Sequence, residues 1–96
     1  MTREQAIEMA SAFRATQKFT DVRAEQFGGE FAKTSNPWQV LLWSINARAG
    51  NRNLTVVEDY RPKMVGAITR KALGKATARD QEAFRRIAAE REMNRS

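Results

Sequence analysis

The chain has 96 residues, of which 42% are hydrophobic, and carries a formal net charge of +6 without any cysteine or histidine. This length predicts one domain over residues 1–96, and the hydrophobic content excludes a wholly disordered chain. The lack of cysteine excludes disulfide scaffolds and thiolate metal sites. There is no apolar run of about 18 residues and no signal-peptide core, so we expect a cytoplasmic protein without a membrane partner.

The first predicted element is a helix over about residues 3–17. Thr2 and Gln5 have the spacing of a capping box, in which each side chain bonds the backbone N–H of the other residue. Apolar residues recur at spacings of three and four, which indicates one buried helix face. This face consists of Ala6, Met9, Ala10 and Phe13.

The second predicted element is a short helix over residues 21–27, which Gly28-Gly29 interrupts. The alternative is a hairpin in which the two glycines form a turn between 22–27 and 30–34. Alanine and glutamate in this stretch favour the helix, so we prefer it. The glycine spacing matches neither a phosphate loop nor a dinucleotide-binding turn.

The densest apolar run occupies residues 37–49 and predicts a central helix. Asn36 suits a helix cap, Pro37 the first helical position and Gly50 the position just past the end. Two apolar stripes then lie on different sides of the helix, so both sides need a cover from the same chain or from a second copy. The first stripe is Trp38, Leu41, Leu42, Ile45 and Ala49, and the second is Val40, Trp43 and Ala47.

Three further segments complete the predicted architecture. The β-branched run at residues 54–57 indicates a short extended segment without a clear partner strand. Pro62 opens a helix over about 62–73, which Gly74 ends. Thr77 and Asp80 form a second capping box at the start of a helix over about 78–93. We therefore predict an all-α fold, a compact bundle of four to five short helices around the central helix.

The positive charge is concentrated in residues 48–75, which hold a surplus of five basic residues. Residues 1–47 have no net charge and residues 76–96 have a net charge of +1. A local positive field attracts an anionic partner, either nucleic acid or an acidic protein surface; the alternative is a solvated face that only keeps the chain soluble. The candidate phosphate-binding residues are Arg48, Arg52, Arg61, Lys63, Arg70, Lys71 and Lys75.

Catalysis is not predicted, because the chain lacks a histidine proton shuttle, a cysteine nucleophile and a serine in a nucleophile-elbow pattern. A reaction that uses lysine, Tyr60 or glutamate remains an alternative. Glu58 and Asp59 are adjacent and point to opposite sides of an extended segment, so they do not by themselves form a metal site. We expect no cofactor and no metal.

Two functional hypotheses remain. The first is a non-enzymatic protein whose basic surface at residues 48–75 binds nucleic acid or a complex that contains it, with Tyr60 available to stack on a base. Residues 62–93 resemble a helix-turn-helix in outline, but the acids in the second helix weaken docking in a major groove. The second is an inhibitor or assembly factor that binds a host protein, as is typical of small accessory proteins of phages and mobile elements. Its partner or homodimer interface would use Trp43, Val40 and Tyr60.

Overall fold

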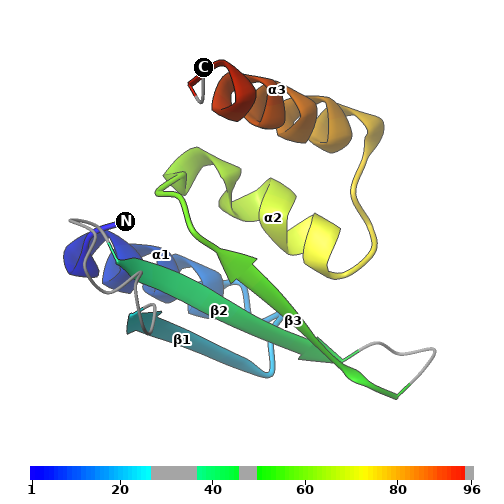
Figure 1. Cartoon of the computed structure of the whole chain (residues 1–96). Coiled ribbons are helices and arrows are strands. Elements are labelled where there is room, and N and C mark those ends of the chain that lie inside the picture. Colours follow the sequence, from blue (N-terminus) through cyan, green and yellow to red (C-terminus); the bar gives the residue numbers. More distant parts are fainter. Residues whose placement is uncertain (27–36, 46–49, 95–96) are drawn as a thin grey trace.

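The structure is a computed structural model, and it describes residues 1–26, 37–45 and 50–94. In Figure 1, a sheet of three strands has one helix packed along it and two further helices stacked beyond its third strand. In chain order the described elements are α1 (Arg3–Ala15), β1 (Asp21–Gln26), β2 (Trp38–Ile45), β3 (Arg52–Val57), the 3₁₀ turn η2 (Pro62–Met64), α2 (Val65–Ala72) and α3 (Ala78–Asn94). The predicted all-α bundle is therefore wrong, and the fold is α+β.

The central helix predicted over residues 37–49 is wrong, because Trp38–Ile45 is the middle strand β2. This strand lies in the middle of the sheet, with one face in the core and the other face partly covered. Both of its faces are therefore apolar, and its sequence shows a continuous apolar run instead of strict alternation. The two apolar stripes assigned to a helix do not match the two faces of this strand, because alternation places Trp38, Val40 and Leu42 on one face and Leu41, Trp43 and Ile45 on the other. Residues 46–49 lie outside the described residues.

The second predicted element is also a strand: β1 occupies Asp21–Gln26 instead of a short helix. The hairpin alternative placed a strand at 22–27, but its glycine turn and its second strand at 30–34 lie outside the described residues. The partner of β1 is β2, which pairs with it antiparallel and places Val22 opposite Leu42. The extended segment predicted at 54–57 is confirmed as part of β3, which pairs with the other edge of β2.

The register divides the sheet into two faces. The inner face, which packs against α1, carries Val22, Val40, Leu42 and Val57 among its residues. Residues directly opposite each other share a face, so Arg23, Leu41 and Val56 lie together on the outer face. Trp43 also lies on this face, opposite Leu54. Leu54 and Val56 are about half exposed there (51% and 44%).

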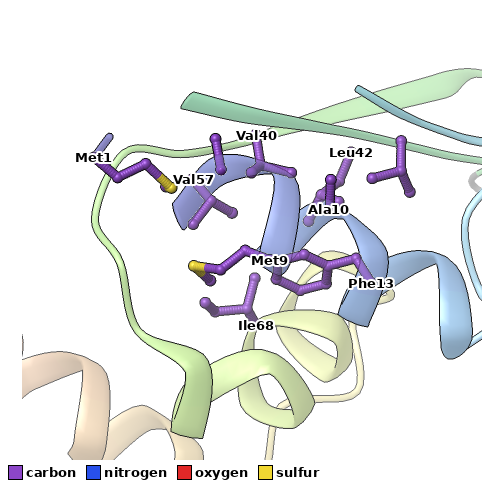
Figure 2. Packing of buried hydrophobic residues seen from close by; sticks show 10 residues of the cluster. Met1, Met9, Ala10, Phe13, Val40, Leu42, Val57 and Ile68 are labelled. Atoms are coloured by element: carbon purple, nitrogen blue, oxygen red, sulfur yellow. The ribbon is translucent and has the colours of Figure 1, made fainter. Parts of the chain in front are cut away.

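The core lies between the inner face of the sheet and the apolar stripe of α1. Figure 2 shows Ala10 of α1 next to Leu42 of β2, and Met9 and Phe13 of the same helix beside Ile68 of α2. Helix α1 begins as predicted, since the N–H of Gln5 donates to Thr2 Oγ1 at 3.2 Å and the N–H of Thr2 donates to Gln5 Oε1 at 3.0 Å. Its buried stripe is confirmed.

Helix α3 is attached to the rest of the chain mainly through α2. The backbone N–H of Asp80 donates to Thr77 Oγ1, and the N–H of Thr77 donates to Asp80 Oδ2, so the second capping box is confirmed. Gly74 ends α2 in the left-handed conformation, with φ +73°. Within the described residues, no helix is both long and apolar enough to cross a membrane.

Candidate functional site

The basic residues of segment 48–75 are spread over three places in the fold. Arg52 begins β3, Lys63 lies in the 3₁₀ turn, and Lys75 follows α2. All three side chains are exposed, and none forms an ion pair with the described part of the chain. Arg48 lies outside the described residues.

The other three candidate cations contact α3. The guanidinium of Arg70 donates from Nε and Nη2 to the two carboxylate oxygens of Asp80, both at 2.7 Å. Arg61 lies 3.7 Å from Glu90. Lys71 Nζ lies over the ring of Phe84, 4.5 Å from its centroid. Arg70 and Lys71 join α3 to α2, and Arg61 joins α3 to the segment before the 3₁₀ turn, so part of the predicted phosphate-binding set has a structural task.

The Arg70–Asp80 contact shifts both groups toward their charged forms. The hydrogen bonds from Arg70 are the main reason that the pKa of Asp80 lies well below its ordinary value, and the backbone N–H of Thr77 adds to this. The same bonds raise the pKa of Arg70. Asp80 is therefore ionised over the whole physiological pH range and holds the start of α3 to the end of α2.

The three residues predicted for a partner interface occupy different environments. Val40 is fully buried in the core. Trp43 is half-buried on the outer face of the sheet, where the Arg23 guanidinium lies 5.3 Å from the ring centroid. Tyr60 is 36% exposed and donates its hydroxyl hydrogen to Glu8 Oε2 of α1, a bond that raises the pKa of the phenol. These side chains do not form one surface.

The two edges of the sheet differ in their charge. The edge strand β1 carries Asp21, Arg23 and Glu25 at alternate positions, and Arg23 pairs with Asp21 at 2.8 Å. Charged residues of this kind prevent an edge from pairing with another strand. The edge strand β3 has no charged residue between Arg52 and Glu58, and no described residue forms a fourth strand beside it. Its edge therefore remains able to pair.

A groove of about 740 Å³ runs along this free edge, between β3 and α3. Leu54 and Val56 from the outer face line it together with Thr55 and Val57 from the inner face, so the groove follows the edge itself. The opposite wall is the apolar side of α3 with part of α2. It is formed by Ile68, Ala72, Phe84, Ile87 and Ala88.

The groove has opposite charge at its two ends. Helix α2 runs back along β3, so its C-terminal end with Lys71 lies toward the beginning of the strand, as Figure 1 shows. The other end is lined by the acids that follow β3 and by Glu92 near the end of α3, together with one cation, Arg61, which lies 3.7 Å from Glu90. These acids are Glu58 and Asp59. An extended chain antiparallel to β3 meets a surplus of acids at its own beginning and Lys71 at its own end.

Sequence reasoning did not find this groove. It identified residues 54–57 as extended and residues 78–93 as a helix, but it did not bring the two segments together. The available signal was the uncharged run from Asn53 to Val57, which contrasts with the charged β1. Because β2 was predicted as a helix, there was no sheet whose edges could be compared.

No group of three or more carboxylate, histidine or cysteine side chains in residues 1–26, 37–45 and 50–94 is placed to hold a metal ion. The expectation of a non-enzymatic protein is untested and remains a prediction. Comparison with family models, with curated proteins and with solved structures finds no match to this chain.

Proposed function

We propose that this chain is a non-enzymatic protein-binding module that takes an extended segment of another polypeptide into the groove between β3 and α3. The observation that carries the proposal is an uncharged strand edge that lines a groove with an apolar wall on α3. Such an edge presents backbone N–H and C=O groups that an added strand satisfies.

The two walls of the groove supply affinity in different ways. Main-chain hydrogen bonds to β3 hold any extended segment, whatever its sequence. Alternate side chains of that segment then contact the apolar residues Phe84 and Ile87 of α3, which are both half-buried. The module therefore selects segments with apolar residues at every second position. An inhibitor or assembly factor that acts on a host protein can work by this binding mode.

The test is selection of linear ten-residue peptides from a phage-displayed library on the immobilised chain. We expect the selected peptides to alternate apolar and polar residues, with basic residues early and acidic residues late. The groove variant is Ile87→Lys, which places a charge on the α3 wall. The matched control is Ile7→Lys, because Ile7 is 47% exposed on α1 and does not line the groove.

The proposal predicts that selected peptides bind the wild type and the Ile7→Lys variant with similar affinity. Ile87→Lys should weaken them at least tenfold while the circular dichroism spectrum stays that of the folded chain. Selected peptides that bind Ile87→Lys as well as the wild type would place the binding surface elsewhere. A selection that yields no peptide above background would contradict the proposal.

A second candidate function is binding to nucleic acid, which the exposed and unpaired Arg52, Lys63 and Lys75 favour within the described residues. Contacts of these side chains to phosphates position a nucleic acid without reading its sequence. Such binding weakens steeply with salt because counterions are released.

Fluorescence anisotropy tests this candidate with labelled single-stranded DNA, duplex DNA and RNA at 50 and 200 mM salt. For six phosphate contacts, the affinity should fall about 10³-fold between the two salt concentrations. The informative variants are Lys63→Glu and Lys75→Glu, since Arg70→Glu also breaks the contact to Asp80. Lys18→Glu is the control, because it makes the same charge change outside segment 48–75. Equal affinity for all three variants, or no binding at 50 mM salt, would exclude the candidate.

A further inference from the structure

We infer that the segment held in the groove is β3 of a second copy, so that two chains form one continuous six-stranded sheet around a two-fold axis. The inference rests on the proposed function, because it names the partner of the same groove. It depends on the pairing of the strand Arg52–Val57 and the following Glu58 with the same residues of the second copy, running antiparallel.

The best match has Thr55 of one copy opposite Thr55 of the other, which also places Asn53 opposite Val57 on the inner face. Leu54 then lies opposite Val56 of the second copy on the outer face, and Arg52 lies opposite Glu58. The two-fold axis repeats each of these pairs. On the outer face, apolar residues therefore meet apolar residues on either side of the axis, and opposite charges meet at both ends, while the threonine hydroxyls meet at the centre of the inner face; all three are favourable cross-strand combinations.

Neighbouring registers lose this complementarity. A two-fold axis perpendicular to the sheet pairs residues of the same face, so the axis passes through 54, 55 or 56. With the axis at Leu54, Arg52 faces Val56. With the axis at Val56, Leu54 faces Glu58. Only the axis at Thr55 keeps the charges paired and uses the whole strand.

The groove fits this occupant in polarity as well. An antiparallel copy of β3 brings its Arg52 to the acidic end, beside Glu58 and Asp59, and its Glu58 toward the end that Lys71 lines. The apolar wall of α3 then covers the new strand. Half-exposed Leu54 and Val56 join the corresponding residues of the second copy in one apolar stripe on the outer face.

Introduced thiols test both the partner and the register, since the natural chain has no cysteine. Opposite residues in an antiparallel pair have Cβ atoms about 4.5–5.5 Å apart, close to the separation that a disulfide needs. Under mild oxidation at low micromolar concentration, Thr55→Cys should form a disulfide-linked dimer. Leu54→Cys and Val56→Cys should each stay monomeric on a non-reducing gel and should cross-link when mixed.

Ile7→Cys measures the background of non-specific cross-linking, because Ile7 is exposed and lies outside the groove. A dimer of Leu54→Cys alone or Val56→Cys alone would overturn the register. Self-pairing would be overturned if neither Thr55→Cys nor the mixture of Leu54→Cys with Val56→Cys cross-linked more than Ile7→Cys. Circular dichroism of each reduced variant confirms that the chain is folded before oxidation.

Charge reversal gives an independent test by light scattering coupled to size exclusion. Arg52→Glu alone places like charges opposite each other at both ends of the strand pair. The dimer of this variant should therefore dissociate at a protein concentration several-fold higher than that of the wild type. The double variant Arg52→Glu with Glu58→Arg restores opposite charges and should restore the dimer. A double variant whose dimer is no more stable than that of Arg52→Glu alone would contradict the pairing.

These results separate the inference from the proposed function. A chain that is monomeric at every concentration and still binds displayed peptides through Ile87 retains the protein-binding function and loses the second copy as its partner. A monomeric chain that binds no peptide loses both. A cross-linked Thr55→Cys dimer that dissociates on reduction and dilution supports both.

Discussion

Asp80 at the beginning of α3 accepts two hydrogen bonds from the guanidinium of Arg70 at the end of α2, each at 2.7 Å. The carboxylate is 7% exposed, and it also accepts the backbone N–H of Thr77 at 3.0 Å. One side chain therefore caps α3 and fixes it to α2. Because α3 forms a wall of the groove, the geometry of the candidate site depends on this contact.

Acid should release α3 before it unfolds the sheet. The pKa of Asp80 is lower in the folded chain than in the unfolded chain, so its contribution to stability is complete above the unfolded value of about 4. The contribution disappears as the pH falls through the lower folded value. Asp80→Asn should remove it at every pH, and amide exchange in α3 should then accelerate at pH 7. Glu82→Gln is the control, since Glu82 forms only exposed ion pairs with Arg85 and Arg86; an equal acceleration in both variants would refute this role of Asp80.

The capping box of α1 should contribute measurable stability. Thr2→Ala removes the acceptor of the Gln5 N–H and should lower the free energy of unfolding by about 1 kcal/mol. Urea denaturation measures the difference. Ser11→Ala, at an exposed position within the same helix, should change stability little by comparison. An unchanged urea midpoint in Thr2→Ala would show that the cap does not form.

Two residues of β2 distinguish the strand from the predicted helix. The helix prediction places Leu42 and Ile45 together on one buried stripe. In the strand Leu42 is fully buried, whereas Ile45 is 58% exposed. Leu42→Ala should therefore cost about 2–5 kcal/mol in urea denaturation, and Ile45→Ala should cost little. Similar large losses in both variants would favour the helix.

The phenol of Tyr60 should titrate above its ordinary value. Its hydroxyl donates to Glu8, which stabilises the protonated phenol, so the pKa of Tyr60 is raised. The chain contains one tyrosine, so the rise of phenolate absorbance near 295 nm reports this group alone. Any stability that the bond contributes is present below about pH 10 and is lost as the pH rises through the folded value. Glu8→Gln should move the titration back toward the ordinary value; a titration that is the same in both chains would show that the bond is absent.

The sequence predicts the helices of this fold much better than its sheet. Thr2 with Gln5 and Thr77 with Asp80 are local signals, and the structure confirms both. The prediction for β2 is wrong because the conformation of this segment depends on residues far away in the sequence. Val22 and Thr55 flank Leu42 only after the sheet forms. A run such as Val40-Leu41-Leu42-Trp43 fits a buried strand and a buried helix alike, and its length of eight residues did not decide between them.

The candidate site is less predictable still. Basic residues can be counted in a sequence, but their partners cannot, and Arg70 is bound to Asp80 ten residues away. The groove requires the edge of β3 and the apolar side of α3 to meet, and those segments are joined only through the path of α2. A helix prediction for residues 37–49 leaves no sheet in the predicted fold, so β3 cannot be recognised as an edge strand.

The most direct measurement is a titration of the isotope-labelled chain with a synthetic peptide of residues 51–59, followed by two-dimensional NMR. This peptide carries the strand of the second copy with the terminal charges that fit the groove. The account predicts shifts of the backbone amides of β3 and of Phe84 and Ile87 on α3, with β1 unchanged. Shifts confined to β1 or to the exposed lysines, or no shift at millimolar peptide, would contradict it.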